Sequence, residues 1–363
     1  MKRLLKPAAR AACWLLLASA VAGCKKTHVP HTVGLALDVG GRGDQSFNDG
    51  ALRGLEQMAA GLKYTARGYE PIPGATSLGI PPPLVLSGKA QEDYEPNLQL
   101  LVDQGSELVI AVGFMMEPAV RAVAARNPGA KFLLLDSPVL DAAGKPSVLP
   151  NVRAVVFREN EGAFLTGALA GALTKTGKIA FVGGIQVPLI RKFEAGYRAG
   201  ARQVNPKVEV LVAYTGSFDD EKKGIETGQD LYGRGCDIIF HGAGLDGLGV
   251  IKSAQQAGKL VIGVDSDQSH VAPHNVLTSM VKRVDLAVYG AVKDVLAGSF
   301  TGGDVALGLK EDGVGLLPVG SEVSLEPAKK TAAEAEVARL RGELIAGRIV
   351  APATLDELAK FKP

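Results

Sequence analysis

Ten short apolar runs, arranged as two series of five, restrict the folds open to this 363-residue sequence. The first series covers residues 33–38, 84–88, 107–113, 131–136 and 152–157. The second series covers residues 177–184, 208–216, 236–244, 259–265 and 276–282. Helical patterns separate the runs, and this alternation is typical of a parallel sheet covered by helices. We therefore predict an α/β fold.

The two series correspond element by element. In each, the third run ends in glycine, a helical pattern follows (117–126 and 247–257), and the fourth run ends in aspartate. Gly113 and Asp136 are 23 residues apart, and so are Gly242 and Asp265. Two homologous lobes with a cleft between their strand ends would explain this correspondence.

The two series differ in one interval near their beginnings. Asp38 to Gly113 spans 75 residues, whereas Gly184 to Gly244 spans 60. The Pro- and Gly-rich stretch 68–83 has nearly the length of this difference, so we predict that it is a surface loop inserted in the first lobe.

Residues 33–62 read as a strand, a glycine-rich loop and the start of a helix. The strand ends at Asp38, and the helix is predicted to begin near Phe47. Ser46 followed three residues later by Asp49 resembles a capping box, which marks a helix N-terminus.

Asp38, Phe47 and Asn48 are therefore expected at the edge where strand ends and helix starts meet, and in open α/β sheets this edge binds ligands. An aromatic ring there is a candidate ligand contact. The alternative is that Phe47 is a hydrophobic staple and that Asp38 only organises the loop.

The first 24 residues have the pattern of a bacterial lipoprotein signal. Basic residues at 2, 3, 6 and 10 precede an apolar run at 11–21 that is too short to span a bilayer, and Ala22-Gly23 precede Cys24. We predict removal of residues 1–23, lipidation of Cys24, and a tether over residues 24–31. The alternative is an ordinary secretory signal with an incidental cysteine.

Composition excludes some classes of function. Without residues 1–23 the chain has 36 basic and 38 acidic side chains and no long basic run, so binding to a nucleic acid polymer is not expected. Cys13 and Cys24 belong to the leader, which leaves Cys236 and no disulfide framework. The chain is long enough for two domains of ordinary size.

One motif favours a different class of protein. Gly242-Ala243-Gly244-Leu245-Asp246-Gly247 follows a strand, opens a helix and is succeeded by Asp265, as in a dinucleotide-binding fingerprint. This strand is third in its series, however, whereas the fingerprint belongs to the first. An NAD-dependent enzyme therefore remains only a remote alternative.

Other motifs for catalysis or metal binding are missing from the sequence. The five histidines are scattered, and there is no Gly-x-Ser-x-Gly elbow or Gly-Lys-Ser/Thr phosphate loop. We predict no catalytic residue, no metal site and no cofactor.

Several motifs, in the same order along nearly the whole mature chain, resemble those of the basic membrane protein family, bacterial lipoproteins similar to the purine nucleoside receptor A that serve ABC importers. They are DVGGRGDQSFNDGALRG (38–54), AVGFMMEPAV (111–120), KFLLLD (131–136), the run 151–184, GSFDDEKKG (216–224), GVDSDQ (263–268) and VLTSMVKRVD (276–285).

The resemblance implies a type I periplasmic-binding-protein fold, that is, two Rossmann-like lobes joined by a three-stranded hinge. The first lobe is expected to contain 32–155 and 280–310, and the second 156–279. We assign 311–363 to the second lobe, although periodicity alone does not place this segment.

The resemblance also implies a ligand site. Phe47 and Phe218 would sandwich a purine base, with Asp38 and Asn48 at its polar edge. Asp265 and Lys282 would hold the ribose hydroxyls. The predicted set is completed by the two glycines that end the third runs, Gly113 and Gly244.

Each assignment has a structural alternative. Lys282 could be a solvated charge at a helix start, and Asp265 could cap its own loop. Phe218, in a polar loop, is hard to explain as a core residue.

The function implied is that of a membrane-anchored, monomeric lipoprotein that binds purine nucleosides in the inter-lobe cleft and passes them to an ABC permease and its ATPase. It would face the periplasm or the cell exterior and would not be an enzyme. A signalling or orphan lipoprotein that senses a ligand with the same fold is the alternative.

Overall fold

A computed structural model of the chain describes residues 32–363. The predicted signal peptide, the lipidation site Cys24 and the tether 24–31 lie outside the described residues.

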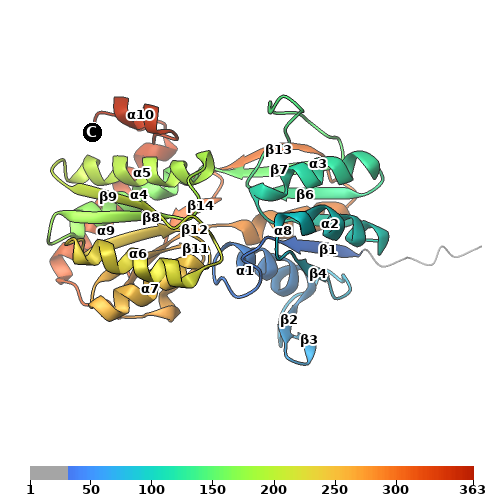
Figure 1. The fold of residues 1–363 in the computed structure, drawn as a ribbon, viewed down its shortest axis with the longest axis horizontal. Helices are drawn as coiled ribbons and strands as arrows, with labels where there is room; N and C mark the ends of the chain where they lie inside the picture. The colour runs from blue at the N-terminus through green and yellow to red at the C-terminus, as the bar shows by residue number, and fades with distance from the viewer. Residues whose placement is uncertain (1–31) are drawn as a thin grey trace, which may run out of the picture. The chain divides into compact units, whose positions relative to one another are not determined.

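The first lobe is built on a six-stranded sheet in the order β13-β7-β6-β5-β1-β4, and every neighbouring pair is parallel (Figure 1). Its strands are β1 (Val33–Leu37), β4 (Leu84–Ser87), β5 (Leu108–Ala111), β6 (Lys131–Leu135), β7 (Val152–Phe157) and β13 (Gly303–Leu307).

The second lobe repeats this arrangement in the order β14-β12-β11-β10-β8-β9, with β14 antiparallel to β12. Its strands are β8 (Lys178–Gly183), β9 (Glu209–Tyr214), β10 (Ile238–Gly242), β11 (Leu260–Asp265), β12 (Val276–Lys282) and β14 (Val314–Leu316). The ten predicted runs all form strands, and the five strands of each series occupy equivalent places in the two sheets.

Helices cover both faces of each sheet, because alternate side chains of a buried strand point to opposite faces. In β5, Leu108 and Ile110 pack into one apolar cluster, and Val109 and Ala111 pack into another. The helices of the first lobe are α1 (Phe47–Leu52), continued by η1 (Arg53–Ala60), α2 (Tyr94–Asp103), α3 (Glu117–Arg126) and α8 (Val284–Leu296). Those of the second are α4 (Glu159–Leu173), α5 (Pro188–Val204), α6 (Glu221–Gly233), α7 (Asp246–Ala257), α9 (Pro327–Ile345) and α10 (Leu355–Lys360).

The chain crosses between the lobes three times, between β7 and α4, between β12 and α8, and between β13 and β14. Strand pairing runs to Phe157 in β7 and to Lys282 in β12. The domain boundaries expected at 155/156 and 279/280 therefore fall inside these two strands. After β14, α9 packs on α4, and α10 packs on α5.

One prediction for the first lobe is wrong in part. The stretch 68–83 was expected to be a surface loop, and residues 72–83 contain neither helix nor strand. Residues 68–71, however, form β3 (Gly68–Pro71), which pairs antiparallel with β2 (Leu62–Thr65) in a hairpin. Arg42 holds this hairpin to the lobe, since its guanidinium bonds Glu56 at 2.7 Å and Tyr69 at 3.2 Å and lies over the Tyr64 ring.

Candidate ligand-binding site

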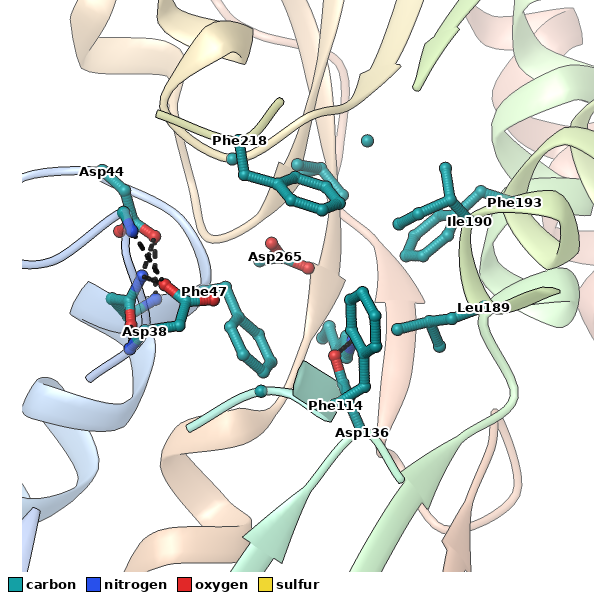
Figure 2. Close-up of a pocket in the computed structure, with 17 residues that line it drawn as sticks. Asp38, Asp44, Phe47, Phe114, Asp136, Leu189, Ile190, Phe193, Phe218 and Asp265 are labelled. Carbon is teal, nitrogen blue, oxygen red and sulfur yellow. Dashed lines mark hydrogen bonds and ion pairs between the residues drawn. The ribbon is translucent and has the colours of Figure 1, made fainter. Parts of the chain in front are cut away.

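A pocket between the two lobes contains all eight predicted ligand-binding residues in its lining (Figure 2). The lining residues are Asp38, Gly40, Asp44, Phe47, Asn48, Gly113, Phe114, Asp136, Leu189, Ile190, Phe193, Phe218, Gly242, Gly244, Val264, Asp265 and Lys282. The space among them, including the part open to solvent, is about 580 Å³.

Asp38 lies at the carboxyl end of β1, with one carboxylate oxygen held by the protein. Its Oδ1 accepts hydrogen bonds from Asn48 Nδ2 (2.7 Å) and from the Gly40 N–H (3.0 Å). Burial raises the pKa of Asp38, although the bond from Asn48 opposes the shift. Gly113 has φ +117°, and a Cβ there would lie 3.1 Å from Asp38 Oδ2, so glycine keeps the space beside this oxygen open.

Asp44 caps helix α1, which corrects the expectation that Ser46 does so. The Asp44 carboxylate accepts from the backbone N–H groups of Ser46, Asn48 and Asp49 at 2.8–3.1 Å. Ser46 makes no side-chain cap bond, and Asp49 accepts from the N–H groups of Gly43 and Gln45 instead. A carboxylate near a helix N-terminus satisfies its free donors and interacts favourably with the helix dipole.

The side-chain amide of Asn48 is held within the first lobe. Besides Asp38, its Nδ2 donates to Asp44 Oδ2 at 3.2 Å, and its Oδ1 accepts from the Asp38 N–H at 3.3 Å. Asn48 therefore orients Asp38.

Phe47 and Phe218 enter the pocket from opposite lobes, and both are half-buried. Phe114 meets Phe218 edge to face, with ring centroids 6.4 Å apart. A Cβ on Gly184 would lie 2.2 Å from the Phe218 ring, so only glycine allows the ring to occupy this position. In Figure 2 the three rings lie between the acidic side chains Asp38 and Asp44 and the apolar side chains of Leu189, Ile190 and Phe193.

Lys282, at the end of β12, is buried in a cluster of carboxylates. Its ammonium bonds Asp136 Oδ2 at 2.6 Å and lies 3.3 Å from Glu159 Oε1. It also lies 4.8 Å from the centre of the Phe47 ring. Burial alone would lower the pKa of Lys282, but Asp136, Glu159 and Asp265 outweigh burial and raise it. The alternative of a solvated helix-start charge is therefore wrong.

Asp136 and Asp265 occupy equivalent places, at the ends of β6 and β11, with φ of +71° and +63°. Burial raises the pKa of Asp136 to about 7, with Lys282 opposing the shift and Glu159 adding to it. Asp136 Oδ1 is buried and accepts no hydrogen bond from the described residues. Asp265 is also buried, which raises its pKa, and its Oδ2 accepts from Ser46 Oγ at 2.6 Å.

Sequence reasoning missed Asp136 as a site residue. The sequence pattern could have identified it, because the fourth run of each series ends in aspartate. A ligand-binding role was predicted only for Asp265.

The loop around Phe218 packs against the dinucleotide-like turn at residues 242–247. Gly244 lies in this turn with φ +54°, and the N–H of Leu245 donates to the carbonyl of Phe218 at 2.9 Å. The Asp246 carboxylate accepts from Ser217 Oγ at 2.8 Å and from the Asp220 N–H at 2.6 Å. The loop around Phe218 thus lies where a pyrophosphate would approach the start of α7.

Two further properties concern residues 32–363 only. Within them, no three or more His, Cys, Asp or Glu side chains are grouped so as to hold a metal ion. None of their helices combines the length and the hydropathy needed to span a lipid bilayer.

Residues 31–347 match the family described as "ABC transporter substrate-binding protein PnrA-like". The chain belongs to this PnrA-like family. It is therefore a substrate-binding protein of the ABC transporter type and not an enzyme.

Named relatives and a solved structure are similar to most of the chain. Basic membrane protein A1 of Borrelia garinii is 33% identical, with 96% of each chain covered. The ABC transporter nucleoside-binding protein BmpA of Lactococcus lactis is 31% identical, with 92% of this chain and 94% of the relative covered. A solute-binding protein of an ABC transporter system from Aeropyrum pernix superposes with a TM-score of 0.75 at 29% identity, covering 91% of this chain and 96% of that one. The fold is the type I periplasmic-binding-protein fold.

Proposed function

We propose that this PnrA-like protein binds purine nucleosides in the pocket between its lobes and delivers them to an ABC permease and its ATPase. The observation that carries the proposal is that one pocket combines two phenylalanine rings from opposite lobes with three strand-end aspartates, Asp38, Asp136 and Asp265. Flat rings suit a base, and carboxylates suit a sugar diol.

In this proposal the base lies between Phe47 and Phe218, since every base has a π-face that stacks on an aromatic ring. Asp38 presents Oδ2 to the N–H groups of the base, and Asn48 holds Asp38 in place. The nucleoside-binding name of the Lactococcus relative supports this choice of ligand.

The ribose is assigned to the strand-end carboxylates. Asp265 Oδ1 and Asp136 Oδ1 accept from its hydroxyls, and Lys282 holds Asp136 through Oδ2. Each hydroxyl thereby donates to a charged acceptor, and such bonds are about twice as strong as neutral ones. The protein acts as a monomer.

The ligand itself can be identified directly. Purified protein, denatured and analysed by mass spectrometry, is expected to release a purine nucleoside. Release of a free base, a nucleotide or an unrelated solute instead would contradict the proposal.

The lipid anchor is proposed at Cys24, on the cell membrane and facing the periplasm or the cell exterior. Cys24→Ser should prevent acylation and move the protein from the membrane fraction to the soluble fraction. Fractionation followed by immunoblotting measures this, with Cys13→Ser as the matched control that stays membrane-bound. If the Cys24→Ser protein remained on membranes, the anchor would lie elsewhere.

Nucleoside binding should depend on pH through Asp136. Its raised pKa of about 7 means that acid protonates the carboxylate that must accept from the sugar. Affinity is therefore expected to fall about tenfold between pH 8 and pH 6, as the ionised fraction falls. Calorimetry across this range measures the effect, and Asp136→Asn should bind more weakly and with a smaller pH dependence. The Asp44 carboxylate, whose pKa is also raised to about 7 by burial, still titrates in that variant. An unchanged affinity from pH 8 to pH 6 in the unmodified protein would exclude this role for Asp136.

A further inference from the structure

Beside the pocket, the loop before α1 in the first lobe touches the loop after β11 in the second. Ser46 Oγ donates to Asp265 Oδ2 at 2.6 Å, and Ser266 Oγ donates to the backbone carbonyl of Ser46 at 3.1 Å. Farther along, His270 Nε2 lies 2.6 Å from Gln45 Oε1. The partners come from different lobes, so opening the cleft would separate them.

Ser46 is at the centre of these contacts. It is fully buried, and Asp265 is 8% exposed, so their bond is shielded from water. Because Asp44 caps α1, the Ser46 hydroxyl is not needed there and is directed across the cleft. A buried hydrogen bond to a carboxylate is among the stronger ones in proteins.

We propose that Ser46 is a closure residue, whose bond to Asp265 stabilises the closed state of the two lobes; its effect on nucleosides rests on the proposed function. The bond occupies Oδ2 of Asp265 and leaves Oδ1 for the ligand. Since it exists only when the lobes are together, it shifts the open–closed equilibrium toward the closed state. Every ligand that needs closure gains from it equally.

Arg53 supports the same contact from the side. Its Nε bonds Asp285 Oδ2 at 3.2 Å in the first lobe, and its Nη1 donates to Ser266 Oγ at 3.4 Å in the second. Ser266 is thereby oriented toward the Ser46 carbonyl.

The test compares Ser46→Ala with Ser253→Ala. Ser253 is a buried serine of α7, outside the pocket, whose hydroxyl bonds the Val250 carbonyl within the same helix. Spin labels on Glu92→Cys and Lys222→Cys, exposed positions on opposite lobes, report the inter-lobe distance, while Cys236 is buried. Distances are measured with and without inosine, and affinities for inosine and hypoxanthine are measured by calorimetry.

Ser46→Ala should shift the inter-lobe distances toward those of the open state. It should also weaken the binding of both inosine and hypoxanthine by about tenfold, or about 1.4 kcal/mol. The affinity ratio of inosine to hypoxanthine should stay unchanged. In an Asp265→Ala background, Ser46→Ala should have a much smaller effect, because only the 3.4 Å bond from Ser46 Oγ to the Val264 carbonyl is left to lose. A purely structural effect of Ser46 within its own lobe would keep its full size in that background. Ser253→Ala should change neither distance nor affinity.

Unchanged distances in Ser46→Ala would overturn the proposal, as would an additive effect in the Asp265→Ala background. If the unmodified protein bound no nucleoside, the proposed function would fail by itself. The ligand-free distances would then still decide the question, because a shift toward the open state supports the closure role and no shift refutes it.

Discussion

An Asp265→Ala variant is expected to bind inosine about a thousandfold more weakly and hypoxanthine only about tenfold more weakly. The tenfold part is the loss of the closure bond from Ser46, which affects both ligands. The remaining hundredfold is the loss of the carboxylate oxygen Oδ1 that accepts from a ribose hydroxyl, since hypoxanthine has no ribose. Calorimetric titration of both ligands measures the two parts separately.

Two controls sharpen this experiment. Asp265→Asn keeps the shape of the side chain, and asparagine tolerates the positive φ of +63°. The loss of inosine affinity in this variant therefore measures the contribution of the carboxylate charge, with the backbone preserved. In the unmodified protein, 2′,3′-dideoxyinosine should bind about as weakly as hypoxanthine. An equal loss for inosine and hypoxanthine in Asp265→Ala would show that Asp265 acts through closure alone.

Alanine at either ring of the proposed sandwich is expected to weaken nucleoside binding by about tenfold to a hundredfold. Stacking of a base on an aromatic side chain is worth about 1–3 kcal/mol, and Phe47 and Phe218 would each provide one face. Leucine should restore only part of the loss, because it fills space without a π-surface. Calorimetry with inosine, and circular dichroism to confirm folding, measure the effect.

The two rings should differ in one respect. Phe47 also lies beside the Lys282 ammonium, so Phe47→Ala disturbs the carboxylate cluster as well as the base. Phe218 packs on Phe114 and Gly184, and its loss is the cleaner measure of stacking. Phe300, a half-buried ring over Arg153 away from the pocket, provides the matched control. If Phe47→Ala and Phe218→Ala both folded and kept full affinity for inosine, the base would not be stacked between these two rings.

The sheets could be predicted because a strand buried on both faces must be apolar throughout, and such runs are visible in one sequence. The two lobes could also be predicted, because the spacing of Gly113 and Asp136 is repeated by Gly242 and Asp265. The hairpin of β2 and β3 was missed for the opposite reason. None of its residues is fully buried, and its Gly- and Pro-containing sequence has the composition of a loop.

The site could be predicted only as far as positions at strand ends. The sequence indicated Asp38, Phe47 and Asp265 because each ends a strand or begins a helix. It could not show that Asp44 caps α1, since Asp44, Ser46 and Asp49 are all plausible caps by residue type. Nor could it show the bond between Ser46 and Asp265, which joins residues 219 positions apart in sequence.

The most direct test of the proposed ligand is the titration of inosine and hypoxanthine into the unmodified protein after bound ligand has been removed. The pocket described here predicts that one inosine binds per chain, at least about a hundredfold more tightly than hypoxanthine. Equal affinity for the two, or heat from neither, would contradict the assignment of Asp136, Asp265 and Lys282 to the sugar and of the pocket to nucleosides.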